Sequence, residues 1–275
     1  MLRIFVVCQN SIYLFEITKC KLEKTIDTFE NRKGLIAVCE VDNNILFAYP
    51  DHKKGYVRVK SINNDEQNSQ LINAHESFIG CVSLNKDGTL LCTASDKGTV
   101  FRVFSTSNGS LMKELRRGAE KAEIFSLSFS HDSRFLACLS DRGTMHVFIL
   151  KTTNDEPNNA NKDTTHNNNN SNTTTNTAAT ASNNNSSDNT EGPKNQTSVL
   201  GKISSFFGKK TGYFNSEWSF AKISIPETKA ICRFDVSNDT NSLIVLGYSG
   251  KYYQVQFDKK IGGNGRIVQE FKLGL

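Results

Sequence analysis

Two adjacent arginines, Arg116 and Arg117, are the residues of this sequence whose type and position best suit the binding of a ligand. They belong to the segment Leu115-Arg116-Arg117-Gly118, which lies between two copies of a sequence repeat. Adjacent side chains of an extended segment point to opposite sides, so we expect the two guanidinium groups to diverge toward different neighbours. Because a guanidinium group donates in a planar fork that matches phosphate, the pair predicts two separate phosphate sites.

The repeat on either side of the arginines supplies further polar groups. Its two best copies contain the turns Ser95-Asp96-Lys97-Gly98-Thr99 and Ser140-Asp141-Arg142-Gly143-Thr144. Each turn follows an apolar strand, and its glycine permits a tight bend. Both turns carry a serine, a threonine and a basic residue, so each arginine would meet hydroxyl donors and a second positive charge. Asp96 and Asp141 are interpreted as residues that stabilise the turns.

The same repeat predicts the fold. Apolar strands and turns recur about every 40 to 45 residues, which is typical of the four-stranded blades of a β-propeller. A weaker third copy runs from Leu243 to Lys251, and a degenerate copy precedes the best two. The sequence therefore predicts an all-β, WD-type propeller with about five blades. The third copy has Gly247 and Lys251 where Ser140 and Thr144 stand, so we expect no phosphate site there.

Two details of the repeat concern the boundaries of strands and domains. The copies are one residue closer after the turn than before it, which predicts a β-bulge in the first copy. A tract of Asn, Thr, Ser and Ala from about residue 153 to 190 has almost no apolar residues and is predicted to be disordered. We therefore assign residues 1–150 to the first part of the propeller and 151–215 to an insertion between the third and fourth strands of one blade. Residues 216–275 form the last strand of that blade and the final blade.

The end of the insertion has an amphipathic pattern. Val199, Leu200, Ile203, Phe206 and Phe207 would lie on one face of a helix flanked by lysines. Such a stretch suits the membrane interface, and the residues predicted to insert are Leu200, Ile203, Phe206 and Phe207. In the alternative interpretation the phenylalanines pack back on the rim of the propeller.

Several segments resemble the PROPPIN (WIPI) family of phosphoinositide-binding autophagy propellers, in particular its WIPI3/WIPI4-like and Hsv2-like members. The segments that carry the resemblance are 73–76, 93–99, 111–118, 140–148 and 216–220, with Leu115-Arg116-Arg117-Gly118 matching the [FL]-R-R-G motif of the family. The family propeller has seven blades, and this chain resembles it from about two blades in, so we expect a product that lacks N-terminal blades.

The resemblance implies two phosphoinositide sites. Site 1 would comprise His75, Ser95, Lys97, Thr99, Arg102 and Arg116. Site 2 would comprise Arg117, Ser140, Arg142, Thr144 and His146. The implied ligands are phosphatidylinositol 3-phosphate and phosphatidylinositol 3,5-bisphosphate in membranes, with the corresponding loop of the family inserting into the bilayer. The implied role is in autophagosome formation, as a monomeric cytoplasmic protein peripherally associated with preautophagosomal, endosomal or vacuolar/lysosomal membranes. A protein of the Atg2 lipid-transfer family is an implied partner, although its known surface belongs to the absent blades.

Composition and missing motifs limit the alternatives. The net charge of +5 and pI of about 8.7 suit an anionic surface without identifying it. No nucleophile elbow, zinc-protease motif or P-loop occurs, and none of the seven cysteines forms a C-x-x-C pair, so we predict neither an enzyme nor a metal or other cofactor. The main rival is a WD-type protein-interaction scaffold without lipid binding, in which the arginines are a solvated edge and His75 belongs to a structural hydrogen-bond network. A nucleic-acid binder is disfavoured because no stripe of aromatic and basic residues is present.

Overall fold

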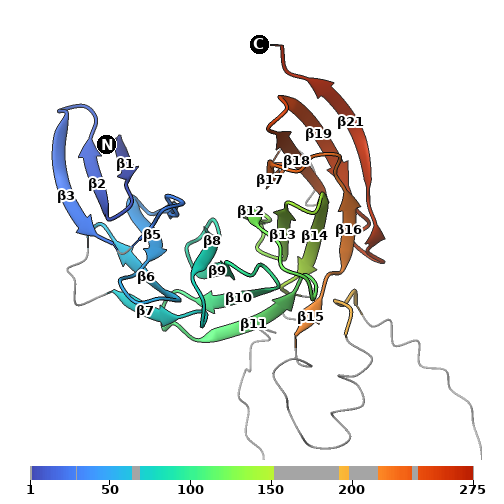
Figure 1. Ribbon diagram of the computed structural model, residues 1–275, viewed down its shortest axis with the longest axis horizontal. Coiled ribbons are helices and arrows are strands. Elements are labelled where there is room, and N and C mark those ends of the chain that lie inside the picture. Colours follow the sequence, from blue (N-terminus) through green and yellow to red (C-terminus); the bar gives the residue numbers. More distant parts are fainter. Residues whose placement is uncertain are drawn as a thin grey trace, which may run out of the picture.

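The computed structural model of the protein describes residues 2–28, 30–63, 69–151, 192–197, 216–236 and 241–274. All regular elements in these ranges are β-strands, which form five sheets placed around an arc (Figure 1). The first sheet and the last sheet face each other across the open side of the arc, so the sheets form an incomplete ring. Within the described ranges, no helix has the length and apolar character needed to cross a membrane.

The first two blades precede the two best repeats, and blade 2 contains the degenerate copy. Blade 1 has three strands, β1 (Arg3–Val7), β2 (Ser11–Glu16) and β3 (Lys21–Asp27). Blade 2 has four strands, β4 (Ala37–Val41), β5 (Asn44–Pro50), β6 (Tyr56–Ser61) and β7 (Gln70–Asn73).

The two best repeats form blades 3 and 4, each with a short fifth strand added from a later part of the chain. Blade 3 comprises β8 (Ile79–Leu84), β9 (Leu90–Ser95), β10 (Val100–Ser105), β11 (Leu111–Arg116) and β15 (Glu217–Trp218). Blade 4 comprises β12 (Ile124–Phe129), β13 (Phe135–Ser140), β14 (Thr144–Ile149), β16 (Ala221–Ser224) and β20 (Gly263–Asn264). Blade 5 comprises β17 (Ala230–Phe234), β18 (Ser242–Gly247), β19 (Lys251–Gln256) and β21 (Arg266–Lys272).

These sheets confirm the predicted all-β propeller of five blades. The third strand of blade 4, β14, pairs with β16, so the long segment between them does separate the third and fourth strands of one blade. The residues that follow the insertion were expected to supply only the last strand of this blade, but they contribute to two blades: β15 pairs in parallel with β11 of blade 3, and β16 belongs to blade 4. Most of the predicted insertion, including the Asn-rich tract, lies outside the described residues.

The predicted β-bulge is a longer hairpin turn. Ala94 pairs with Phe101 across the turn of blade 3, whereas Leu139 pairs with Met145 across the turn of blade 4. Residues 95–100 therefore fill the first turn and residues 140–144 the second. The pairing of β9 with β10 is regular from Phe101 onward. The spacing correctly indicated one extra residue, but that residue sits in the turn, so the prediction of a bulge was wrong.

The hydrophobic core consists of layers between successive blades. Each blade packs one face against each neighbour, and side chains alternate between the two faces. Phe101 of blade 3 meets Phe148 of blade 4 edge to face, with 5.7 Å between ring centroids. The Leu115 side chain is fully buried in this same layer. Because side chains alternate along a strand, the next residue of β11, Arg116, faces blade 2.

Candidate functional site

Arg116 and Arg117 leave the end of β11 on opposite sides. Arg116 lies opposite Val100, on the face of blade 3 turned away from the Leu115 core and toward blade 2. Arg117 follows the strand, and its Nε donates to the carbonyl oxygen of Gly98 at 2.8 Å. Each arginine is only 7% exposed, so neither side chain extends into bulk solvent. The divergence expected from strand alternation is thus present in the structure.

Site 1 occupies the junction of blades 2 and 3. The Nε2 atom of His75 lies 2.9 Å from the hydroxyl oxygen of Thr93, and both residues are buried. Burial lowers the pKa of His75 to about 4, with a further contribution from the positive charge of Arg102. Arg102 donates to the carboxylate of Glu114 at 2.9 Å and to the carbonyl oxygen of Ala74 at 2.7 Å. The bond from Arg102 to Ala74 and the contact between His75 and Thr93 join blade 3 to the segment that follows β7 of blade 2. Both residues therefore also stabilise the fold.

Site 2 occupies the junction of blades 3 and 4. His146 is buried, and its Nδ1 atom lies 3.2 Å from the hydroxyl oxygen of Ser219. Burial lowers the pKa of His146 to about 4, and the positive charges of Arg117 and Lys222 lower it further. The imidazole is therefore neutral at pH 7 and lies within the electrostatic reach of two cations.

The turn of blade 4 completes site 2. Ser140 is almost fully buried at the end of β13. Arg142 donates to the carbonyl oxygen of Lys121 at 3.0 Å and forms an exposed ion pair with Glu120 at 3.5 Å. An exposed pair of this length contributes little to stability and is easily exchanged for another anion. Burial lowers the pKa of Arg117, which lies close enough to Arg142 for their charges to interact.

The structure brings together most of the predicted residues of each site. It differs from the expectation in which residue of site 1 is structurally equivalent to which residue of site 2. Arg102 lies opposite Thr93, and His146 lies opposite Cys138, so Arg102 matches His146 in position. The expectation that both pockets share the same parts is therefore corrected. The reason is the longer turn of blade 3, which puts Val100 rather than Thr99 in the position of Thr144. Lys97 is exposed at the tip of this turn, and Thr99 is half-buried.

Sequence reasoning missed two charged residues on the faces of these sites. Glu114 lies two residues before Arg116 on β11 and shares its face, so strand alternation was enough to find it. Lys222 lies opposite His146, in a strand separated from β14 by the long insertion. No spacing rule reaches across that insertion, so only the strand register identifies Lys222.

The third copy of the repeat contains an acidic group instead of a hydroxyl. Gly247 takes the position of Ser140, and a Cβ atom at Gly247 would lie 2.4 Å from the carboxyl carbon of Glu227. Lys251, in the position of Thr144, forms an ion pair with Glu270 at 2.8 Å. A carboxylate at this position repels an anion, in line with the expectation of no third site.

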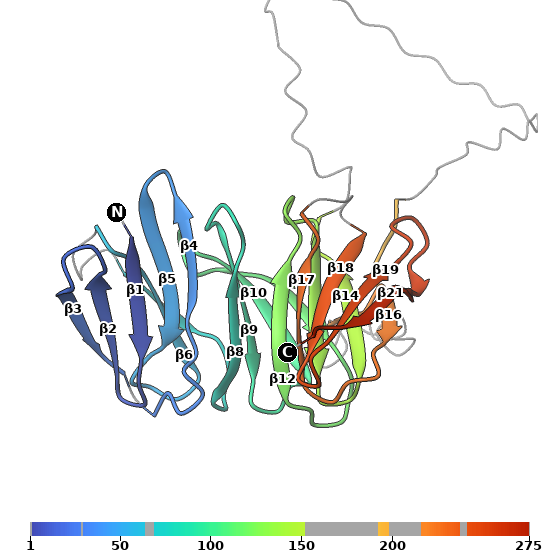
Figure 2. The same cartoon turned by 90° about the horizontal axis from the view of Figure 1, so that it is seen from above.

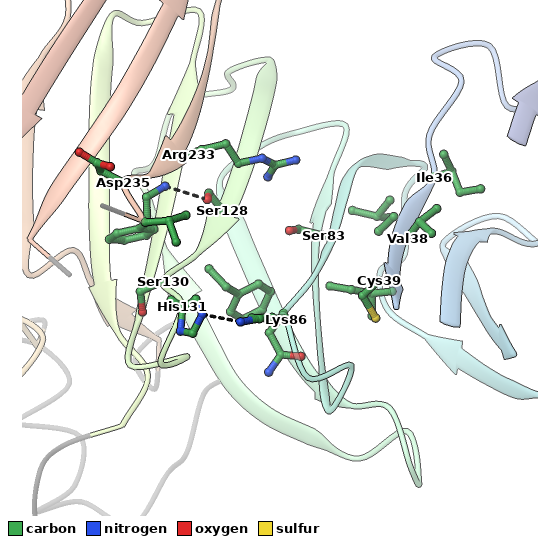
Figure 3. Close-up of a pocket in the computed structure, with 17 residues that line it drawn as sticks. Ile36, Val38, Cys39, Ser83, Lys86, Ser128, Ser130, His131, Arg233 and Asp235 are labelled. Atoms are coloured by element: carbon green, nitrogen blue, oxygen red, sulfur yellow. Dashed lines mark hydrogen bonds between the residues drawn. The ribbon is translucent and has the colours of Figure 1, made fainter. Parts of the chain in front are cut away.

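A cavity of about 710 Å³ is distinct from the arginine sites. It is lined by the innermost strands of blades 2 to 5 (Figure 3). Lys86 and His131 lie across its floor with 2.5 Å between Nζ and Nε2. Innermost strands line the channel of a propeller, so this cavity follows from the architecture. Among the described residues, no group of three or more His, Cys, Asp and Glu side chains is placed to hold a metal ion.

The residues predicted to insert into membranes, Leu200, Ile203, Phe206 and Phe207, lie outside the described residues. Both ends of the segment that carries them return to the junction of blades 3 and 4. Asn195 donates to the carbonyl oxygen of Ile149 at 2.7 Å, and Trp218 donates its backbone N–H to the carbonyl oxygen of Gln196 at 2.8 Å. The described residues on both sides of the segment therefore contact β14 of blade 4 and β15 of blade 3.

Repeated four-stranded blades, with interblade sites at the end of one strand, define the class of this protein as a WD-type β-propeller. The chain belongs to the PROPPIN family, whose model matches residues 1–189. It is 32% identical to autophagy-related protein 18 of Dictyostelium discoideum over 98% of this chain and 68% of that protein. It is 30% identical to autophagy-related protein 18e of Arabidopsis thaliana over 94% of this chain, but it spans only 58% of that relative.

Solved structures show the same fold. The Hsv2 crystal structure from Kluyveromyces marxianus superposes with a TM-score of 0.65 at 20% identity, covering 99% of this chain and 69% of Hsv2. A complex of KlAtg21 with the coiled coil of AgAtg16 contains a chain that superposes with a TM-score of 0.60 at 23% identity, covering 99% of this chain and 68% of that one. At these identities the comparison establishes the propeller architecture, and the predicted family is confirmed by the family model.

Proposed function

We propose that this chain binds membranes through 3-phosphorylated phosphoinositides, with one headgroup at the blade 2–blade 3 junction and another at the blade 3–blade 4 junction. The observation that carries the proposal is the divergence of Arg116 and Arg117 into these two junctions. Each arginine is largely buried, and each junction also holds a buried serine and a neutral histidine. Pre-positioned guanidinium groups bind phosphate with little further loss of side-chain entropy.

The arrangement suits a phosphomonoester in particular. A headgroup with two negative charges on one phosphate needs several convergent donors, and arginine, serine and turn amides supply them. A bound dianion would also stabilise the protonated form of the nearby histidine and so raise its pKa. Membrane binding at mildly acidic pH would then become stronger, because the protonated imidazole adds a further positive charge to the site.

A WD-type scaffold without lipid binding is the second candidate, and specific contacts favour it. Arg102 bonds to Ala74 and Glu114, while Arg117 bonds to the carbonyl oxygens of Gly98 and Glu120. In this alternative the arginines only join the blades. The two candidates differ in whether loss of the arginines abolishes lipid binding in a protein that remains folded.

The family membership supports a role in autophagy, since the matched relatives are autophagy-related proteins. We place the chain in autophagosome formation, recruited from the cytoplasm to membranes that contain phosphatidylinositol 3-phosphate or the 3,5-bisphosphate. Loop residues Leu200, Ile203, Phe206 and Phe207 would add a second attachment by inserting into the bilayer. An Atg2-type partner is proposed from the family resemblance alone. A coiled-coil partner of the Atg16 type is proposed because KlAtg21 has been solved with the coiled coil of AgAtg16.

Vesicle flotation tests the proposal. The protein should float with vesicles that contain phosphatidylinositol 3-phosphate and remain at the bottom with vesicles of phosphatidylcholine alone. The double variant Arg116→Thr, Arg117→Thr should lose this binding. Arg266→Thr, which removes an exposed arginine from β21 of blade 5, is the matched control and should float normally.

Because both arginines are buried, circular dichroism and a thermal melt must show that the double variant is folded. The Arg116→Lys, Arg117→Lys variant provides a second check, since it keeps the charge and should retain part of the binding. Flotation of the folded double variant at the wild-type level would overturn the proposal in favour of the scaffold.

A further inference from the structure

The strand registers identify equivalent residues on the face of blade 3 that lines site 1 and on the face of blade 4 that lines site 2. On blade 3, one cross-strand row runs through Thr93, Arg102 and Glu114. On blade 4, the matching row runs through Cys138, His146 and Lys222. The fourth-strand position therefore holds a carboxylate beside site 1 and an ammonium group beside site 2.

The replacement of Glu114 by Lys222 at the matching position gives the two sites different net charges. In site 1, the guanidinium group of Arg102 is neutralised by Glu114 in an ion pair of 2.9 Å, and Ser216 also donates to this carboxylate. In site 2, the position of Arg102 holds the neutral imidazole of His146, and the position of Glu114 holds a cation. The row next to site 1 thus has no net charge, whereas the row next to site 2 has a charge of +1.

Lys222 is available to an incoming anion. Its side chain is exposed, and it takes part in none of the ion pairs found among the described residues. Its charge nevertheless acts on His146, because it helps to lower the pKa of that buried imidazole. The ammonium group therefore lies at the outer edge of the same site that contains Arg117 and Ser140.

We infer that Lys222 is a headgroup-binding residue of site 2, and that site 2 takes the inositol ring with more phosphates while site 1 takes a ring with one. The inference rests on the proposed function. Arg117, Arg142 and Lys222 give site 2 three cations from three separate segments, which suits two phosphates on different ring positions. Site 1 has Arg116 as a buried cation and Lys97 in its turn, but the charge of Arg102 is balanced by Glu114, so its net positive charge is lower than that of site 2.

The test uses proteins that retain one site each. Arg116→Thr leaves site 2, and Arg117→Thr leaves site 1. Calorimetric titration with water-soluble short-chain phosphatidylinositol 3,5-bisphosphate and 3-phosphate measures each site without a contribution from membrane insertion. In the site 2 protein, Lys222→Glu should weaken binding of the bisphosphate on the order of tenfold, and Lys222→Arg should restore it.

Two controls separate a local effect from a change in total charge. Lys222→Glu in the site 1 protein should leave binding unchanged. Lys272→Glu, a matched reversal of an exposed lysine on β21 of blade 5, should have no effect in either protein. Equal losses for Lys222→Glu in both single-site proteins, or for Lys222→Glu and Lys272→Glu, would overturn the inference.

Failure of the proposed function has a different signature. If the unmodified protein binds neither soluble headgroup nor vesicle, the phosphoinositide proposal itself falls. If it binds both headgroups but Lys222→Glu leaves binding by the site 2 protein unchanged, only the role of Lys222 is wrong.

Discussion

A buried histidine occupies each candidate site, with His75 near Arg102 in site 1 and His146 near Arg117 in site 2. His75 contacts the Thr93 hydroxyl, and His146 contacts that of Ser219. Their pKa values near 4, against 6.5 for an ordinary histidine, arise first from burial. Each imidazole is thus kept neutral next to a guanidinium group, where a second cation would be repelled.

Stability should consequently fall between pH 7 and pH 5. The unfolded chain takes up protons on these histidines below pH 6.5, whereas the folded chain resists protonation until about pH 4. The contribution of neutral histidine is therefore complete above pH 6.5 and is lost as the pH falls toward 4. Linkage gives a loss of about 2 kcal/mol per histidine between pH 7 and pH 5.

Urea unfolding of the protein and of His146→Gln at both pH values measures this contribution. The variant should lose about 2 kcal/mol less between pH 7 and pH 5, because glutamine does not titrate. His52→Gln, at an exposed histidine, should behave like the unmodified protein. An equal pH dependence for the unmodified protein and His146→Gln would contradict the assignment.

At the scale of elements, the hairpin turn between β9 and β10 positions site 2. Gly98 has a φ of +62°, and its carbonyl oxygen accepts the bond from Arg117. A Cβ atom at Gly98 would lie 2.0 Å from the carbonyl oxygen of Ala122 in the linker that leads to blade 4. The turn and the linker can approach only because this residue has no side chain.

Gly98→Ala should therefore destabilise the protein by about 3 kcal/mol, since a left-handed backbone and a backbone clash add together. Gly250→Ala is the matched control, because Gly250 has a φ of +76° but no atom within 4 Å of the added Cβ. It should cost about 1 kcal/mol. Thermal and urea unfolding compare the two variants, and equal costs would show that the linker moves away without penalty.

At the scale of the whole molecule, the two ends of the arc expose apolar sheet faces. Across blade 5, Ile231, Leu246, Tyr252 and Phe271 form one cross-strand row on the face turned away from blade 4. Ile231 is 56% exposed and Phe271 is 42% exposed. Figure 2 shows blades 1 and 5 at opposite ends of the row of blades. Contiguous apolar surface of this kind favours association.

The double variant Ile231→Thr, Phe271→Thr should reduce concentration-dependent self-association of this 275-residue chain, measured by light scattering, and lower the fluorescence of a hydrophobic dye. Its stability should change by less than about 1 kcal/mol, because both side chains lie on the solvent-exposed face of the sheet. Val245→Thr, on the buried face of the same sheet, should instead destabilise by about 1 to 3 kcal/mol. Unchanged association in the double variant would show that this face is not responsible.

Much of the fold was predictable because its signals are local. The turns at Gly98 and Gly143 and the apolar strands before them recur in sequence, which identified the blades. The short strand β15 was not predictable, since its pairing with β11 joins segments about a hundred residues apart. Candidate site residues on the repeat itself, such as Ser140 and Arg117, were predicted by the same local reasoning, whereas Lys222 was not.

By itself the sequence determined the order of strands, the number of blades and the opposite directions of Arg116 and Arg117, because alternation along a strand is a property of the backbone. Only the tertiary structure decided which side chains meet at each junction. The register between β14 and β16 brings Lys222 to site 2, and the pairing of β10 with β11 brings Glu114 to Arg102. Such registers depend on how distant segments bury their apolar faces together, so a local sequence pattern does not predict them.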